Sequence, residues 1–454
     1  MGAGAESMRP ADPAVLACQR QCGLPIGHGF EQRVANLLIA LLGQLLQPLA
    51  GEGGPGAIPG LRVLRAPRTT PQRHCHAENL RCASTSRLAM AILDFMNNKI
   101  TRIAIVGIGA AARSIHLPAY RGIPDLEIVG GVDPQFTADH GIRMYSSLAS
   151  LIAQARPDIV TIATPPATHF ALAREALESG CHVFLEKPIA PTLAEGAALV
   201  RIAQQSGRQL IVNSEFRFMS CHASAQQLIG TEEFGELRFV HLHQTFRANA
   251  VTESGWRGTE SERTCTEFGI HALDLCRFFF NAEPLRLRAH MAGASGALGP
   301  DMLNLMDLDF SLGRFARITL DRLTRGRHRY LDCRLDGTRA TIETEVGGAL
   351  EFNCGIRSGT RRPYVNFDFS AGGRAFIYNG ERRRKTASDP IDLFAAATRR
   401  LMQAVLKALA AGSTPPCNAV DNFRSFALMR AAYESARDGR DINVSQLYES
   451  ATSI

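Results

Sequence analysis

Two titratable side chains, a lysine and a histidine, are the strongest candidates for chemistry in this chain. Lysine occurs only four times among 454 residues, against 46 arginines, and Lys187 follows an apolar segment, His182–Leu185, that reads as a buried strand. Glu186 precedes this lysine and Pro188 follows it. At the end of such a strand, an ammonium group can donate a hydrogen bond to a substrate hydroxyl and stabilise its alkoxide character. The alternative is a solvated Glu–Lys pair at the surface.

A second group of candidates begins 80 residues later, where Glu267, His271 and Asp274 are spaced as on one helix. Residues four apart lie on one helix face, so Glu267 and His271 can point into one pocket. We expect His271 to be a general base that Glu267 polarises or orients. We expect Asp274 to bind the substrate, the second imidazole nitrogen or a nearby backbone group. The alternative is an exposed Glu–His pair on a helix whose apolar face is buried.

A glycine-rich turn predicts a dinucleotide site earlier in the chain. Gly107, Gly109 and Ala112 form G-x-G-x-x-A at the end of the apolar run Ile100–Gly107. The first glycine permits a tight turn, the second lets the backbone approach a pyrophosphate, and the alanine lets the next helix pack closely. Asp133 ends the next expected strand, where a carboxylate binds ribose hydroxyls and repels a 2′-phosphate, so NAD is favoured over NADP. The alternative is a structural turn with an unrelated aspartate.

These motifs depend on a repeating order of strands and helices. Apolar runs alternate with helical patterns about every 30 residues, which predicts an α/β Rossmann domain with a doubly wound parallel sheet over residues 98–218. Thr164 and Pro165 follow its third strand at the carboxyl edge, where we expect them to contact the cofactor. An ordinary turn with a preset proline also explains them. The expected strands are Ile100–Gly107, Glu127–Val132, Ile159–Ala163, His182–Leu185 and Gln209–Val212, and helices are expected at Phe170–Glu178 and from Thr192.

The rest of the chain has a different pattern. Consecutive strands, many of them alternating, predict an α+β domain with a large, mainly antiparallel open sheet over residues 219–450. Helical spacing returns between Pro390 and Arg440, with a break at Gly412–Pro416. The expected strands are Arg238–Gln244, Leu303–Phe310, Ala316–Asp321, Tyr330–Leu335 and Arg339–Glu343.

Residues 1–97 lack the patterns of a folded domain. Glycine and proline recur there without a period, and residues 51–60 consist largely of glycine, proline and alanine. We interpret this segment as disordered, or as an upstream extension whose true start is Met90 or Met96. An organellar transit segment is the alternative, because arginine is frequent.

Composition excludes several classes of protein. Residues 100–454 carry 40 basic and 37 acidic side chains, so we expect no nucleic-acid partner. No apolar run is long enough to cross a membrane, and no signal peptide is recognisable, so a cytoplasmic protein is expected. The eleven cysteines form no C-x-x-C pair, which argues against a zinc ribbon and a disulfide framework, and no metal is expected.

Taken together, the motifs resemble the glucose–fructose oxidoreductase, inositol dehydrogenase and MocA (Gfo/Idh/MocA) family of NAD(P)-dependent oxidoreductases. The resemblance spans roughly Thr101 to Arg440. It rests on G-I-G-A-A-A at 107–112, H-L-P-A at 116–119, A-T-P-P at 163–166, E-K-P at 186–188, E-F-G-I-H-A-L-D at 267–274 and A-Y-E-S-A-R-D-G-R at 432–440. It implies a Rossmann domain and an open-sheet domain with the substrate between them, and a dimer or tetramer formed through the open sheet.

The resemblance also implies roles for single residues. Glu186 would lie at the cofactor edge, and Arg217, which matches an arginine that the family carries after the last Rossmann strand, would bind the cofactor. An arginine that packs between the domains is the alternative for Arg217. Glu267 stands where the family usually has Asp, and Ser261–Cys265 stands where it often has a glycine cluster. Both departures can alter substrate choice, and together they could abolish dehydrogenase activity.

The sequence is therefore interpreted as an NAD-dependent oxidoreductase that acts on a sugar, polyol, inositol or related hydroxyl-bearing small molecule. Lys187 and His271 would bind the reacting oxygen. Two alternatives remain at this point. The first is an enzyme that uses transient oxidation for elimination or glycoside cleavage, and the second is an NAD-binding sensor without activity.

Overall fold

The computed structural model describes residues 100–135, 141–248, 261–293, 301–326, 328–356, 363–380 and 382–452. The segment 1–97, interpreted above as an extension, lies outside these residues. The described elements belong to one compact unit, Ala91–Ile454, which is distinct from Met1–Met90. Everything below concerns that unit.

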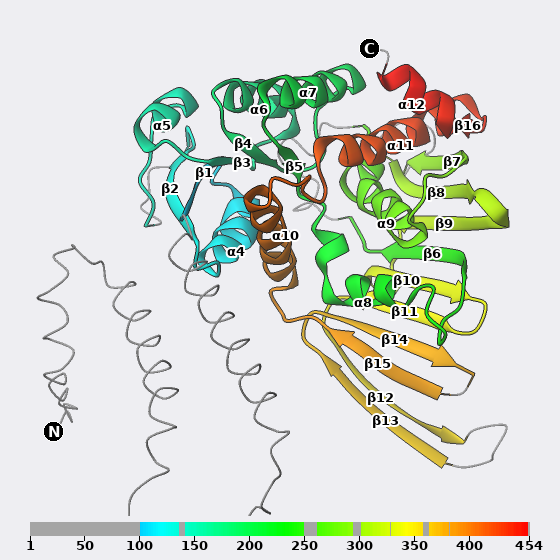
Figure 1. The fold of residues 1–454 in the computed structure, drawn as a ribbon. Coiled ribbons are helices and arrows are strands. Elements are labelled where there is room, and N and C mark those ends of the chain that lie inside the picture. The colour runs from blue at the N-terminus through cyan, green and yellow to red at the C-terminus, as the bar shows by residue number, and fades with distance from the viewer. Residues whose placement is uncertain are drawn as a thin grey trace, which may run out of the picture. The chain divides into compact units, whose positions relative to one another are not determined.

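A five-stranded parallel sheet confirms the expected doubly wound α/β fold. Its strand order is β2-β1-β3-β4-β5, so the direction of winding reverses between β1 and β3. In sheets of this kind, ligands bind at the carboxyl ends of the strands beside such a reversal. Helices α6 and α7 lie on one face and α4 on the other (Figure 1). The strands are β1 (Thr101–Val106), β2 (Leu126–Val132), β3 (Ile159–Ile162), β4 (His182–Leu185) and β5 (Leu210–Val212), and the helices are α4 (Leu117–Arg121), α5 (Leu148–Ala155), α6 (His169–Glu178) and α7 (Leu193–Ser206).

The ends of α7 illustrate how local sequence sets these elements. The Thr192 hydroxyl accepts a hydrogen bond from the backbone N–H of Glu195 at 3.2 Å and donates one to its carboxylate at 2.8 Å. The first bond is half of the capping box that the sequence predicts, while the Glu195 carboxylate binds the Thr192 hydroxyl instead of its backbone N–H. Gly207 ends the helix with φ +63°, a left-handed conformation that glycine adopts without steric cost.

A nine-stranded sheet confirms the second, mainly antiparallel layer. Its order is β15-β14-β11-β10-β6-β9-β8-β7-β16, and β6 and β9 are its parallel pair. Helices α8 (Ser220–Leu228) and α9 (Ile270–Phe280) pack on one face, while Leu305 and Phe315 are exposed. The strands are β6 (Leu237–Thr245), β7 (Arg286–Gly293), β8 (Asp301–Phe310), β9 (Arg314–Asp321), β10 (Arg329–Gly337), β11 (Thr341–Val346), β14 (Gly373–Asn379), β15 (Arg382–Ser388) and β16 (Ile442–Asn443).

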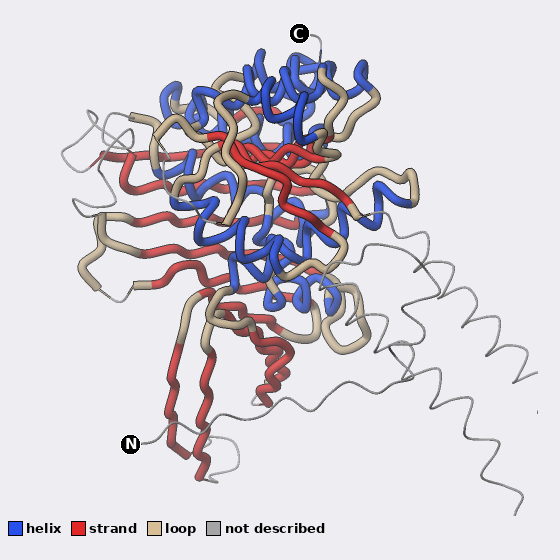
Figure 2. Tube along the Cα trace, turned by 90° about the vertical axis from the view of Figure 1, so that its left-hand side faces the viewer, coloured by secondary structure: helices blue, strands red, loops and turns tan. Residues whose placement is uncertain are grey.

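A separate ribbon of two strands, β12 (Ala349–Ile356) and β13 (Pro363–Ser370), was not expected from the sequence. Figure 2 shows it extending away from the helices. Strands β7, β14, β15 and β16 were not expected either.

The last long helices return to the first sheet. Helix α10 (Leu393–Ala410) packs on α4, and α11 (Ala419–Asp438) packs on α7 and α9, followed by α12 (Val444–Thr452). Arg399 on α10 donates hydrogen bonds to the carbonyl oxygens of Pro118 and Ala119. The backbone N–H of Val212, in edge strand β5, donates to the carbonyl of Cys417 at 2.9 Å. Residues placed by sequence in the second domain therefore complete the core of the first.

Within the described ranges, no helix is both long and apolar enough to cross a membrane.

Candidate active site

A cavity of about 500 Å³ lies at the carboxyl edge of the parallel sheet and is lined by residues from both parts of the unit. Its walls include Lys187, at the end of β4, and His271, on α9. Residues 84 positions apart in sequence thus face one space. The other lining residues include Gly109, Ala110, Thr164, Pro165, Glu186, Glu215, Phe216, Glu267, Tyr330 and Phe394.

The turn after β1 has the shape that a dinucleotide needs. Gly107 has φ +87°, and a Cβ atom there would lie 2.8 Å from the carbonyl oxygen of Ala163. A Cβ on Gly109 would meet nothing within 4 Å, so the backbone at Gly109 is open to a close neighbour. Ala112 is fully buried, which lets the following helix pack on the sheet. These three positions fit the pyrophosphate of NAD at a helix N-terminus.

Asp133 is held against this turn. One carboxylate oxygen accepts a hydrogen bond from the backbone N–H of Ile108 at 2.7 Å, and the other accepts one from Gln135 at 2.8 Å. The carboxylate is therefore fixed beside the glycine turn at the end of β2. Each oxygen has a further lone pair, so the group can still accept hydrogen bonds from ribose hydroxyls.

Lys187 is anchored to the second part of the site by the backbone. Its ammonium group donates a hydrogen bond to the main-chain carbonyl of Glu267 at 2.8 Å. The Glu267 carboxylate forms an ion pair with Arg263, one turn earlier, whose side chain is almost completely buried. In this structure the carboxylate is thus turned to Arg263, a residue that sequence reasoning noted only as a replacement for the glycine cluster.

His271 is buried as a neutral base. Its ring packs against the Phe216 ring with 4.2 Å between the centroids. Burial, and then the positive charge of Lys187, hold the pKa of His271 well below its usual value of 6.5, while Glu186 opposes the shift. A neutral imidazole near pH 7 can accept a proton.

Glu186 is the charged centre of a buried network. Its carboxylate binds Nε2 of His116 at 2.8 Å and accepts a hydrogen bond from the Asn213 amide at 2.9 Å. The other His116 nitrogen binds the Tyr120 hydroxyl at 3.1 Å. Burial alone would raise the pKa of Glu186, but His116, Asn213 and Lys187 outweigh burial and lower it to about 2. The carboxylate is therefore ionised and fixed next to Lys187.

A buried histidine joins the two loops that carry the cofactor-edge residues. The two ring nitrogens of His169, at the start of α6, lie 2.8 Å from the carbonyl oxygen of Pro188 and 2.9 Å from that of Thr164, and a neutral imidazole donates a hydrogen bond to one of these oxygens at a time. Burial is the main cause that lowers the pKa of His169. The histidine therefore holds the loop after β3, including Pro165, against the loop after β4.

Arg217 and Asp274 do not line this cavity, which corrects their expected places. The Arg217 guanidinium binds both carboxylate oxygens of Asp274, at 2.5 and 2.7 Å, and Asp421 on α11 at 2.7 Å. Asp274 also accepts a hydrogen bond from Ser425 at 2.7 Å. Asp274 thus binds Arg217 and Ser425, and no hydrogen bond joins it to His271. The pair is instead a buried link between α9, α11 and the turn after β5.

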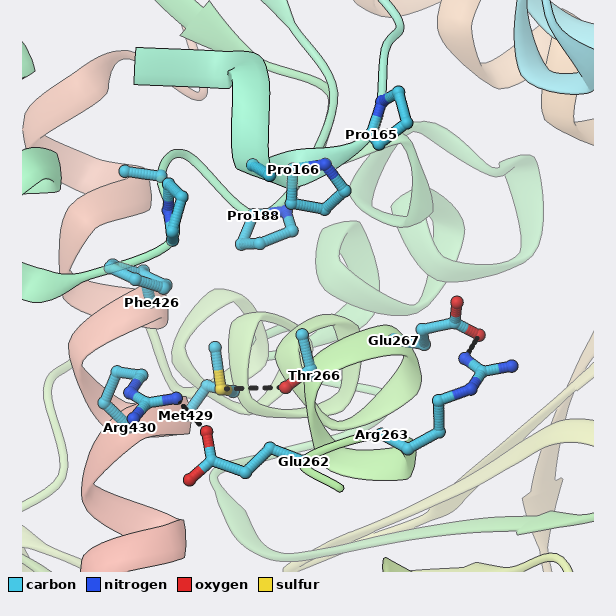
Figure 3. A pocket seen from close by; sticks show the side chains of 13 residues that line it. Pro165, Pro166, Pro188, Glu262, Arg263, Thr266, Glu267, Phe426, Met429 and Arg430 are labelled. Atoms are coloured by element: carbon cyan, nitrogen blue, oxygen red, sulfur yellow. Dashed lines mark hydrogen bonds and ion pairs between the residues drawn. The ribbon is translucent and has the colours of Figure 1, made fainter. Parts of the chain in front are cut away.

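A smaller cavity of about 230 Å³ adjoins the first. Figure 3 shows Pro165, Pro166 and Pro188 on one side of it, with Arg263 and Glu267 on the other. Glu262 forms an ion pair with Arg430 of α11 at the same cavity. Residues replacing the expected glycine cluster thus line a space next to the candidate site.

The segment 263–265 is fixed from outside its own helix. The Asp301 carboxylate, at the start of β8, accepts hydrogen bonds from the backbone N–H groups of Arg263, Thr264 and Cys265, the last at 2.9 Å. An anion at this position satisfies the free N–H groups that begin a helix. Asp301 therefore positions the helical segment that carries Glu267.

Sequence reasoning missed several residues of the site. Glu215 is the clearest case, because it lines the cavity and is 6% exposed. Its one sequence signal is that an acid follows the expected strand Gln209–Val212 at the carboxyl edge. His116 begins the H-L-P-A motif, but neither it nor Asn213 showed from sequence that it binds Glu186, which lies far away in the chain. Within the described ranges, no group of three or more His, Cys, Asp or Glu side chains is placed to bind a metal.

Comparisons with known proteins agree with this architecture. Residues 101–214 match the family described as "Oxidoreductase family, NAD-binding Rossmann fold", and residues 222–343 match the GFO/IDH/MocA C-terminal domain. A D-apiose dehydrogenase from Paraburkholderia graminis is 26% identical over 367 residues, which are 77% of this chain and 92% of that protein.

Two solved structures have the same fold. An oxidoreductase from Agrobacterium radiobacter, in complex with NAD+, L-tartaric acid and magnesium, has a TM-score of 0.63 and 21% identity, with 77% of this chain and 100% of that chain covered. An aldose–aldose oxidoreductase from Caulobacter crescentus, complexed with glycerol, has a TM-score of 0.62 and 20% identity, with 76% and 100% covered.

Proposed function

Since the chain belongs to the Gfo/Idh/MocA family of NAD-binding oxidoreductases, we propose that it oxidises one hydroxyl of a sugar, polyol or inositol, with Lys187 and His271 at the reacting oxygen. The observation that carries this proposal is the shared cavity. Lys187, His271 and the open backbone at Gly109 line the same space at the carboxyl edge of the parallel sheet. The D-apiose dehydrogenase relative supports the substrate class.

NAD would be held by three parts of the chain. The glycine turn with Gly107, Gly109 and Ala112 would carry the pyrophosphate, and Asp133 would bind the adenine ribose. Thr164, Pro165 and Glu186 would lie along the nicotinamide half, since Thr164, Pro165 and Glu186 line the cavity. When bound, NAD+ supplies the acceptor for the hydride that leaves the substrate carbon.

The residues of the chain manage the proton and the charge of the reacting hydroxyl. His271 takes the hydroxyl proton, because its depressed pKa keeps the imidazole neutral. Lys187 donates a hydrogen bond to the oxygen as it gains alkoxide character. The main-chain carbonyl of Glu267 accepts a hydrogen bond from Lys187 and so fixes its position. The ionised carboxylate of Glu186 lies next to the ammonium group and balances its positive charge. In the reverse direction, His271 returns the proton to the same oxygen.

A lysine substitution tests the assignment. Lys187→Met should abolish turnover while binding of NADH, followed by its fluorescence, changes little. Lys407→Met is the matched control, because Lys407 is exposed on α10 and should keep full activity. The assay is NADH formation with D-apiose, D-glucose, D-xylose and myo-inositol. Undiminished turnover in Lys187→Met would contradict the role of the ammonium group. Wild-type NADH formation also separates net oxidation from transient oxidation, which forms none.

We also propose a cytoplasmic protein that forms a dimer or tetramer, and two further features support this. The described cysteines 181, 221, 265, 276, 333, 354 and 417 are free thiols, which suits the reducing cytoplasm. Leu305 and Phe315 are 40% and 48% exposed on neighbouring strands of the open sheet. This surface is a candidate contact between subunits of a dimer or tetramer. Leu305→Asp with Phe315→Asp should then give monomers by light scattering.

A further inference from the structure

The cavity contains a second carboxyl group that the reaction described above does not use. Glu215 opens the turn Glu215–Phe218 after β5 and lines the same space as Lys187 and His271. The side chain is 6% exposed, and its Oε2 atom is buried without a hydrogen-bond partner. Buried carboxyl oxygens nearly always have a partner, so this one needs an explanation.

The surroundings of Glu215 are supplied by several elements. Glu186 and Lys187 face it from the end of β4, Asp274 from α9, Tyr330 from β10 and Cys417 from the segment before α11. Two of these neighbours, Glu186 and Lys187, line the same cavity as Glu215. Two of them, Glu186 and Asp274, are acids whose negative charge acts on Glu215. Among the described residues Oε2 of Glu215 has no hydrogen-bond partner, and the residue as a whole lines the cavity.

The charge state of Glu215 suits a hydrogen-bond donor. Burial, and then the negative charge of Glu186, raise the pKa of Glu215 to about 8, while Lys187 opposes the shift. Near neutral pH the group is a carboxylic acid that can donate one hydrogen bond and accept others. A second ionised carboxylate beside Glu186 would be unfavourable, and a neutral acid removes that cost.

We propose that Glu215 is a substrate-binding residue that hydrogen bonds a second hydroxyl of the substrate, next to the hydroxyl that Lys187 and His271 bind. The inference rests on the proposed function, and it narrows the substrate to a compound with at least two nearby hydroxyls. A site built this way discriminates against analogues that lack the hydroxyl, since a buried polar group is then left unpaired.

The test compares substrates that differ by one hydroxyl. The panel is D-apiose, D-glucose, D-xylose and myo-inositol, followed by the monodeoxy analogues of whichever is oxidised fastest. In the wild type, loss of the contacted hydroxyl should lower kcat/KM roughly 10- to 100-fold. Glu215→Met should lower kcat/KM for the parent compound by a similar factor and should lower it little further for that one analogue. Glu215→Gln keeps a donor and an acceptor, so it should stay within roughly 5-fold of wild type.

Two measurements guard against a purely structural effect. Wild-type kcat/KM should fall as the pH rises through about 8, because the donated proton is lost, and Glu215→Gln should lack this fall. Glu178→Met, on the exposed end of α6, is the matched control and should behave as wild type. Circular dichroism and NADH binding check that each variant folds.

The outcomes separate the two proposals. Equal proportional losses in Glu215→Met for the parent and every monodeoxy analogue would overturn the role of Glu215 while leaving the proposed function intact. A Glu215→Gln profile identical to wild type across pH would overturn it as well. Absence of wild-type turnover with every compound would overturn the proposed function, and this inference with it.

Discussion

Replacing Arg217 by methionine should destabilise the protein without weakening its binding of NAD. The guanidinium forms three hydrogen bonds to Asp274 and Asp421, and the side chains of Arg217 and Asp274 are 13% and 5% exposed. Removing one partner of a buried ion pair leaves an uncompensated charge, which typically costs about 3–5 kcal/mol. Arg277 lies 3.8 Å from Asp274 and the Ser425 hydroxyl still binds it, so we expect the low end, about 3 kcal/mol.

Urea unfolding followed by circular dichroism measures this loss, and NADH fluorescence measures the affinity. Adding Asp274→Asn to Arg217→Met should recover part of the stability, because the buried charge disappears. Arg238→Met is the matched control, since the Arg238–Glu236 pair is exposed and should contribute less than about 1 kcal/mol. Unchanged stability together with a tenfold weaker affinity for NADH would refute the reasoning and return Arg217 to the cofactor site.

Four further predictions follow from individual residues. Gly107→Ala should destabilise the fold, because the new Cβ would lie 2.8 Å from the Ala163 carbonyl oxygen, and a thermal melt measures this loss. Gly109→Ala should fold normally but lose affinity for NADH, which a fluorescence titration measures. Asp133→Ala should reduce the preference for NAD over NADP, and an unchanged ratio of kcat/KM values would count against its ribose contact. Glu215→Gln should raise the free energy of unfolding near pH 9 by at most about 5 kcal/mol and hardly change it near pH 4. The reason is that folding raises the pKa of the Glu215 carboxyl from 4.5 to about 8, so the wild-type protein loses stability as the pH rises between these two values, and the glutamine variant does not. The acid limb of kcat/KM for oxidation should lie below pH 6.5, since the pKa of His271 is depressed, and a limb above that value would argue against a buried neutral base.

The sequence predicted the parallel sheet closely because its signals are local. The run that became β4 (His182–Leu185) was expected with the same bounds, and Thr192 begins α7 as its capping box predicts. The tight turn at Gly107 was expected directly after the first strand, and the structure has it there, with φ +87°. Such patterns do not depend on contacts between distant parts of the chain.

The missed features depend on contacts that sequence spacing does not reveal. Arg217 was expected either to bind the cofactor or to pack between the domains, and its partners in the structure, Asp274 and Asp421, lie 57 and 204 residues away in the sequence. Glu267 was expected to orient His271, but a charged residue one helical turn earlier forms an ion pair with its carboxylate. The ribbon β12–β13 was missed although its sequence alternates, since Leu350, Phe352 and Cys354 on β12 are separated by Glu351 and Asn353. On β13, Val365, Phe367 and Phe369 are separated by Asn366 and Asp368 in the same way.

The return of α10 and α11 to the first sheet has a consequence for biosynthesis. Leu401 and Met402 belong to the same apolar cluster as Ile103 and Ile105 on β1, which are translated about 300 residues earlier. The nucleotide-binding domain of the nascent polypeptide therefore stays incomplete until nearly the whole chain has been synthesised. During this interval its apolar surface is exposed, and chaperones that prevent aggregation would be needed most. For the same reason, a fragment ended after β5 should aggregate instead of forming an independent NAD-binding module.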